Sequence, residues 1–114
     1  MDGSNKDRRV SRLTEAIPLL LGYIRQQAPL IHCITNPISI NDCANILLAI
    51  GARPIMAEHQ KEVAEITAIA KALALNLGNI TDARMESMQI ASQAAHRLHI
   101  PSVIDLVGIA CSSL

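Results

Sequence analysis

The chain has 114 residues, half of them apolar, with ten basic residues balancing ten acidic ones and Tyr23 as its one aromatic side chain. This length suits one domain, and a neutral chain almost without aromatic rings argues against a nucleic-acid partner. Its three cysteines show no close pairing, which argues against a disulfide framework or a zinc site and fits reduced thiols in the cytoplasm. The apolar run from Ile17 to Leu21 is too short to span a membrane.

In the first third of the chain, the sequence pattern predicts a loose terminus, a helix and a strand. Residues 1–10 are polar and are expected to be loose. Residues 11–27 carry apolar side chains three or four positions apart, which predicts a helix, with Pro18 as a kink or a late start. The short apolar run Leu30–Cys33 predicts the first strand.

The rest of the chain alternates between helical and strand patterns. A helix is predicted that has Ser39 as its N-cap and stops at Gly51. Strands are predicted at residues 53–56, 72–77 and 101–105, and helices at residues 58–71 and from Thr81 onward. The inward positions of these two helices are predicted to be Val63, Ile66, Ile69 and Ala70, and then Met85, Met88, Ala91, Ala95 and Leu98.

The order of elements is helix, strand, four times over. Strands separated by helices of ten residues or more predict crossover connections and a parallel sheet. We therefore expect an α/β fold with about four parallel strands and alternating helices, forming a single domain over residues 11–114.

Four side chains or turns follow the four predicted strands: Asn36, Met56, Gly78 and Asp105. In an open parallel sheet, ligands bind at the carboxyl ends of the strands. Taken singly, Asn36 before a proline is more often a turn residue than a ligand contact, and Met56 is more often core. Asp105 suits a position near Mg²⁺ or phosphate about as well as a helix cap. The residues alone leave these alternatives open.

Several motifs closely resemble the N-terminal half of the hydroxyethylthiazole kinase family. The first is the block His32–Asn36, and the longest is Ala44–Met56. Others are Glu62–Val63, Ala72–Gly78 and Asp105–Gly108. The likeness covers roughly residues 14–110 in order and spacing.

The resemblance implies a partial ribokinase-like α/β fold. It also implies an enzyme that uses ATP and Mg²⁺ to phosphorylate 4-methyl-5-(2-hydroxyethyl)thiazole, in thiamine synthesis, as a trimer. By matching position, Asn36 and Met56 would contact the thiazole, Gly78 and Asn79 would approach it from a neighbouring subunit, and Asp105 would lie near the metal and the phosphates.

The chain also departs from the family pattern. This chain has Asn79 where the family usually has a threonine, and Leu106 where the family usually has a proline. Residues 109–114 end before the position of a family arginine that contacts ATP. The family's catalytic cysteine lies beyond Leu114, and Cys111 follows the wrong strand to be that residue. No catalytic residue is therefore assigned, and the 114-residue chain alone is expected to be weakly active or inactive.

There are two alternatives to the kinase function. The first is a non-catalytic thiazole-binding or assembly protein that lacks the nucleotide half. The second is a receiver-type flavodoxin-like domain, which the asparagine at position 36 and the lack of any lysine after Lys71 argue against. A truncated or split gene product is a further expectation.

Overall fold

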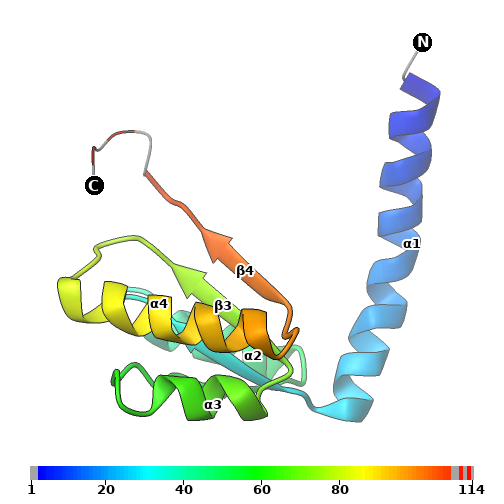
Figure 1. Ribbon diagram of the computed structural model, residues 1–114. Helices are drawn as coiled ribbons and strands as arrows, with labels where there is room; N and C mark the ends of the chain where they lie inside the picture. The colour runs from blue at the N-terminus through cyan, green and yellow to red at the C-terminus, as the bar shows by residue number, and fades with distance from the viewer. Residues whose placement is uncertain (1–2, 109–110, 112, 114) are drawn as a thin grey trace.

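The computed structural model describes residues 3–108, 111 and 113. Helices and strands alternate, as the sequence predicts, and each strand is followed or preceded by a helix (Figure 1). The elements are α1 Gly3–Gln27, β1 Leu30–Ile34, α2 Ile40–Ala49, β2 Arg53–Ile55, α3 Val63–Ile69, β3 Ala72–Asn76, α4 Asp82–Arg97 and β4 Ser102–Asp105.

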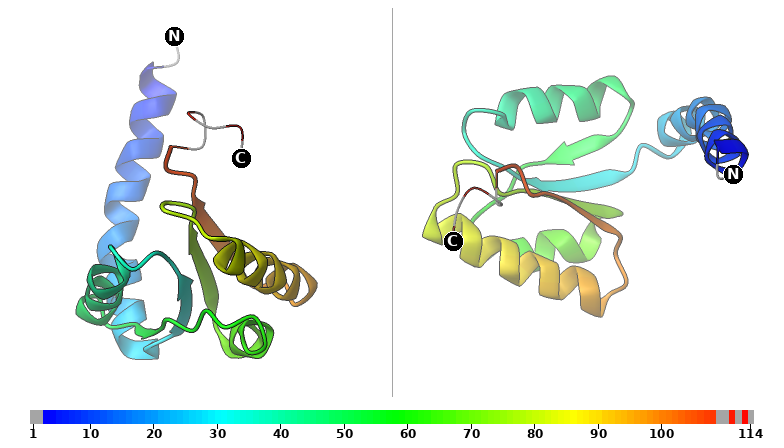
Figure 2. Two further views of the ribbon diagram at one scale, coloured as in Figure 1. Left: turned by 90° about the vertical axis from the view of Figure 1, so that its left-hand side faces the viewer. Right: turned by 90° about the horizontal axis from the view of Figure 1, so that it is seen from above.

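All four strands pair in parallel in the order β2-β1-β3-β4, which confirms the predicted α/β class. A helical crossover brings the chain back to the same end of the sheet each time, so parallel pairing follows. Helix α2 lies on one face, while α3 and α4 lie together on the other (Figure 2). The strands β1 and β3 are central, and β2 and β4 form the two edges.

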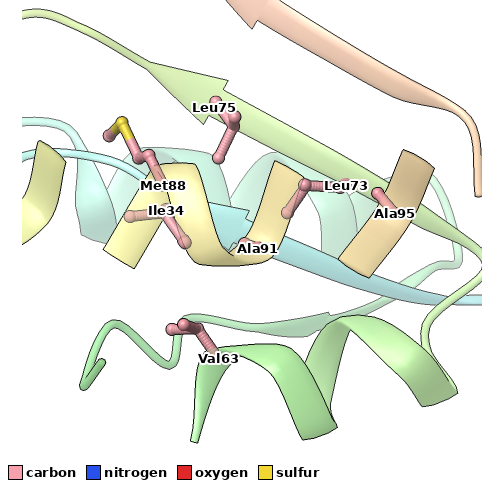
Figure 3. Close-up of a cluster of buried hydrophobic side chains, with 7 residues drawn as sticks. All are labelled: Ile34, Val63, Leu73, Leu75, Met88, Ala91 and Ala95. Carbon is pink, nitrogen blue, oxygen red and sulfur yellow. The ribbon is translucent and has the colours of Figure 1, made fainter. Parts of the chain in front are cut away.

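The hydrophobic core fills the space between the sheet and the helices α3 and α4 (Figure 3). Ile34 and Leu73 come from the two central strands and are fully buried. Burying each such aliphatic side chain contributes about 1.5–3 kcal/mol. The complete buried cluster is Ile34, Val63, Leu73, Leu75, Met88, Ala91 and Ala95.

Some predicted core positions are wrong. Ile69 and Leu98 are 65% and 44% exposed, because each lies at the last turn of its helix, beyond the part that packs on the sheet. Thr67 takes the inward position on α3 in place of Ile69. Along strand β3, only Leu73 and Leu75 are buried.

Helix α1 begins at Gly3, so residues 3–10, which the sequence predicts to be loose, are helical. No proline or glycine lies between residues 4 and 17, and extending a formed helix costs little per residue. Residues 1 and 2 lie outside the described part. The helix runs past Pro18 without ending, buries none of its side chains and projects away from the sheet (Figure 1).

The turn after α2 passes close to Arg25 of α1 at Gly51. This residue has φ +96°, and a Cβ there would lie 2.8 Å from Cγ and 3.0 Å from Cα of Arg25. Only glycine combines that backbone conformation with the required space. The prediction that α2 stops at this glycine is confirmed.

Helix α3 is shorter than predicted, because a turn occupies its expected start. The ring Nδ1 of His59 accepts the N–H of Lys61 at 3.1 Å, and the carbonyl of His59 accepts from Glu62 and Val63. Such local side-chain bonds compete with the helical ladder. None of the helices in the described part of the chain is long and apolar enough to cross a membrane.

Candidate functional site

The carboxyl ends of the four strands meet at one edge of the sheet, and all of the predicted site residues lie there. The register pairs Ile34 of β1 with Leu75 of β3, and Asn76 with Asp105 of β4. The strand order then fixes the order in which the loops lie along this edge. The loop with Met56 comes first, followed by those with Asn36, Gly78 and Asp105.

Asn36 joins the loops after the two central strands. Its Oδ1 accepts the N–H groups of Ile38 and Ser39 at 3.0 and 3.1 Å, and its Nδ2 donates to the carbonyl of Gly78 at 3.0 Å. The side chain is only 7% exposed. The turn role that the Asn-Pro sequence favours is therefore present, together with a bond between loops that the sequence did not predict.

The predicted N-cap residue of α2 uses its side chain elsewhere. Ser39 occupies the N-cap position but makes no side-chain capping bond. Its hydroxyl instead lies 2.7 Å from the hydroxyl of Thr35 and donates to Asn36 Oδ1 at 3.3 Å. The hydroxyl thus supports the loop after β1.

The Gly78–Asn79 loop is a tight turn held from both sides. The N–H of Gly78 donates to Oδ1 of Asn76 at 2.7 Å. A Cβ on Gly78 would lie 3.0 Å from that oxygen and 3.2 Å from Nδ2 of Asn36. Asn79 adopts φ +49°, a left-handed conformation that asparagine tolerates better than most residues. The space beside Gly78 is therefore filled by the side chains of Asn76 and Asn36, which also bond its backbone.

Arg84, near the start of α4, supports this loop from below. Its guanidinium is 6% exposed, and Nη2 donates to the carbonyl of Asn79 at 2.8 Å. Its Nη1 is buried and makes no hydrogen bond within the described residues. Thr81 caps the helix as predicted, since its Oγ1 accepts the N–H of Arg84 at 3.3 Å.

Asp105 ends the edge strand β4 and is exposed. Its Oδ1 accepts the N–H of Val107 at 2.9 Å, and its carbonyl accepts from Leu77. A hollow of about 680 Å³ opens beside it, lined by residues of β1, β3 and β4 and by Cys43. Over residues 3–108, with 111 and 113, no three His, Cys, Asp or Glu side chains come together as a metal cluster.

Met56 lies at the same carboxyl-end side of the sheet, directly after β2, the edge strand opposite β4, and is half-buried. The two residues that follow it are held by side chains from other elements. Nε2 of His32 bonds the carbonyl of Ala57 at 2.7 Å, and Oγ of Ser87 donates to the carbonyl of Glu58 at 2.6 Å. The backbone after Met56 is thereby fixed on two sides.

His32 is fully buried between β1 and α3, where Nδ1 lies 2.8 Å from Oγ1 of Thr67. Because a carbonyl only accepts, Nε2 carries the proton toward Ala57 and Nδ1 accepts from the threonine hydroxyl. Burial lowers the pKa of His32 below 6.5, opposed by the bond to Ala57 and by the charge of Glu62. The imidazole is therefore held neutral.

Sequence reasoning missed His32, Thr67, Ser87 and Arg84. A signal existed for the first of them, since a polar ring between apolar strand residues must find hydrogen-bond partners once it is buried. The partners lie 25 and 35 residues away in sequence, so the pattern alone could not name them.

This chain resembles known proteins in sequence and in structure. The model of the hydroxyethylthiazole kinase family matches residues 21–114. Hydroxyethylthiazole kinase 2 of Clostridium botulinum (strain Hall) is 64% identical over 91 residues, which cover 80% of this chain and 34% of that protein. Hydroxyethylthiazole kinase of Methanobrevibacter smithii is 46% identical over 103 residues, covering 90% of this chain and 36% of that protein.

A solved structure has the same arrangement of elements. The hydroxyethylthiazole kinase protein of Pyrococcus horikoshii OT3 superposes with a TM-score of 0.75 at 40% identity, over 77% of this chain and 35% of that one. The chain thus spans about a third of the length of the relatives that it matches.

Proposed function

Because this chain belongs to the hydroxyethylthiazole kinase family, we propose that its strand-end loops form the thiazole side of a kinase site. The reaction transfers the γ-phosphoryl group of ATP to the hydroxyl oxygen of 4-methyl-5-(2-hydroxyethyl)thiazole, which loses its proton as ADP leaves. One observation carries the proposal. The loops of β1 and β3 are joined through Asn36 and Gly78, in a chain 64% identical to a named kinase of this type.

The chemistry of these loops suits a small aromatic alcohol. Met56 offers a flexible, polarisable thioether, which packs well against a sulfur-containing ring. Gly78 adds no side chain of its own, and the side chains of Asn36 and Asn76 fill the space beside it and hold the loop in a tight turn. Asn36 ties the loop after β1 to the loop after β3 within one chain, so a Gly78 loop that approaches the thiazole from a neighbouring subunit would be held in place by Asn36 of that same subunit.

The nucleotide side of the site would begin at Asp105. Mg²⁺ bound to nucleotide phosphates needs only one or two protein carboxylates, and an exposed carboxylate next to a hollow fits that requirement. When bound, the metal would neutralise charge on the transferring phosphoryl group. Positioning the thiazole alcohol falls to the loops of β1, β2 and β3.

We also propose that the protein assembles with copies of itself, as a trimer, in the cytoplasm. Large apolar side chains along α1 support assembly, among them Leu13 and Leu19, which are 66% and 77% exposed. Free cysteines at positions 33, 43 and 111 support a reducing compartment. Light scattering on the purified chain would detect assembly as a mass above that of one 12.3 kDa chain.

A chimera tests the proposed activity. Residues 21–114 of this chain would replace the matching segment of the Clostridium botulinum relative, and ADP release would be followed with thiazole alcohol, ATP and Mg²⁺. We expect turnover from the chimera, and none or little from the 114-residue chain alone. In the chimera, Met56→Ala should raise KM for the thiazole alcohol about tenfold, equal to 1.4 kcal/mol, and leave KM for ATP unchanged.

A control variant and the active parent relative are measured alongside the chimera. Gly22→Ala lies in α1, where a Cβ meets no atom within 4 Å, and should leave turnover unchanged. A chimera that folds but does not turn over, beside an active parent relative, would contradict the proposal. So would a Met56→Ala chimera with an unchanged KM for the thiazole alcohol.

A further inference from the structure

The segment between β2 and α3 is clamped at two successive carbonyls. His32 of β1 bonds the carbonyl of Ala57 over 2.7 Å, and Ser87 of α4 bonds that of Glu58 over 2.6 Å. Both side chains are buried, at 0% and 1% exposure. The clamp therefore reaches the segment from the sheet and from a helix at once.

We propose that His32 and Ser87 are positioning residues, which set Met56 for contact with the thiazole ring through the backbone of the next two residues. The inference rests on the proposed function, since it gives Met56 the thiazole as its ligand. Neither side chain touches the ligand in this account. Each acts by fixing where the preceding backbone, and hence the thioether, lies.

The geometry favours positioning over simple packing. Residues 56–62 lie outside any helix or strand, so their carbonyls lack the ladder that fixes regular elements. Two buried donors supply that restraint at Ala57 and Glu58. Burying a neutral imidazole or a hydroxyl is costly unless it is hydrogen-bonded, and an apolar side chain would fill the same volume without that requirement.

The carbonyl of Ala57 fixes the proton on Nε2 of His32, and Thr67 satisfies the other ring nitrogen. The hydroxyl of Thr67 lies 2.8 Å from Nδ1 of His32 and donates to it. Removal of the Thr67 hydroxyl leaves the Nε2 bond to Ala57 in place. Thr67→Val is therefore a matched control, which alters the same buried ring without releasing the segment.

The test follows the methyl group of Met56 by NMR in the 114-residue chain. Of the four methionines in the sequence, Met88 lies in the core and reports whether a variant keeps its fold. His32→Gln retains a donor near Nε2, while His32→Asn retains one only near Nδ1. Ser87→Ala removes the second bond alone, and Met56→Leu assigns the methyl signal.

The expected pattern separates the variants. His32→Asn and Ser87→Ala should shift the Met56 methyl signal and speed amide exchange over residues 56–58 about tenfold, as expected for loss of one buried hydrogen bond. His32→Gln should restore both measures. Thr67→Val should lower the melting temperature but leave the Met56 signal in place.

Two results would overturn the inference. One is a Met56 signal that His32→Asn moves no further than Thr67→Val does, with Met88 unchanged. The other is His32→Gln behaving like His32→Asn. Titration with thiazole alcohol is read separately. If the chain shows the expected methyl pattern but the wild type binds no thiazole, the proposed function is refuted. If His32→Asn and Ser87→Ala leave thiazole binding unaltered, the positioning role is refuted.

Discussion

The side-chain amide of Asn36 donates a hydrogen bond of 3.0 Å to the carbonyl of Gly78, which lies 42 residues further along the chain. The same side chain closes its own turn through Oδ1. One buried residue thus holds the loop after β1 in a turn and ties it to the loop after β3. The link therefore fixes how two loops of the candidate site lie relative to each other.

Asn36→Asp isolates the link. Aspartate keeps the oxygen that accepts from Ile38 and Ser39 but places a second oxygen where Nδ2 donated to Gly78. Loss of the bond, with two acceptors facing each other, should lower the free energy of unfolding at pH 7 by about 1–3 kcal/mol. Urea denaturation measures this change.

Acid should partly rescue Asn36→Asp, because a protonated carboxyl can donate to Gly78 again. The deficit relative to wild type should therefore shrink as the pH falls toward 4. A variant as stable as wild type at pH 7 would show that the Asn36–Gly78 bond contributes nothing to the fold.

Gly78→Ala tests the space at the second loop. The new methyl group would lie 3.0 Å from Oδ1 of Asn76 and 3.2 Å from Nδ2 of Asn36. Both atoms are held by hydrogen bonds to Gly78 itself, so neither can move away without breaking a bond. We expect a loss of about 1–3 kcal/mol in thermal or urea unfolding.

Gly22→Ala is the matched control for this substitution. It adds the same methyl group in α1, in open space, and should stabilise the protein by up to about 1 kcal/mol through helix propensity. Equal effects at the two positions would mean that the Gly78 loop accommodates a side chain.

The sequence predicts the scaffold well, for physical reasons. Alternating periodicities place every helix and strand, and alternation of the two forces a parallel sheet. Parallel strands in turn bring their carboxyl ends to one edge, which is why Asn36 and Gly78 could be assigned to a common site before their contact was known.

The links within the site could not be predicted, because they join residues far apart in sequence. Nothing local to His32 points to Ala57, and nothing local to Ser87 points to Glu58. The cap of α2 has a different cause, since Ser39 turns toward Thr35, four residues earlier in the chain, instead of the helix. Local patterns specify where a polar group falls, but packing selects its partner.

Cys33 should make the stability of the protein fall at high pH. Burial, followed by the neighbouring thiol of Cys43, raises the pKa of Cys33 from 9.0 to about 11. Above pH 9 the unfolded chain loses this proton while the folded chain keeps it, so the stabilisation is complete below pH 9 and is lost as the pH rises toward 11. Melting temperatures of wild type and Cys33→Ala across this range measure the difference.

The comparison between the two proteins removes the contribution of other groups that titrate at high pH. Wild type should lose stability more steeply than Cys33→Ala between pH 9 and 11. Parallel curves would mean that the thiol ionises equally in both states.

His32 should have the opposite dependence at low pH. Its pKa is lowered by burial, so the unfolded chain takes up a proton near pH 6.5 while the folded chain stays neutral. Stability is then complete above pH 6.5 and falls as the pH drops below that value. His32→Gln carries no ionisable ring, and its melting temperature should decline less than that of wild type between pH 6.5 and 5.

Calorimetric titration of the 114-residue chain with 4-methyl-5-(2-hydroxyethyl)thiazole tests the central claim most directly. We predict saturable binding by wild type and by Gly22→Ala, with an affinity about tenfold lower in Met56→Ala, as expected for loss of a contact worth 1.4 kcal/mol. Absence of binding by the folded wild-type chain, or equal affinities in wild type and Met56→Ala, would contradict the assignment of these loops to the thiazole side of the site.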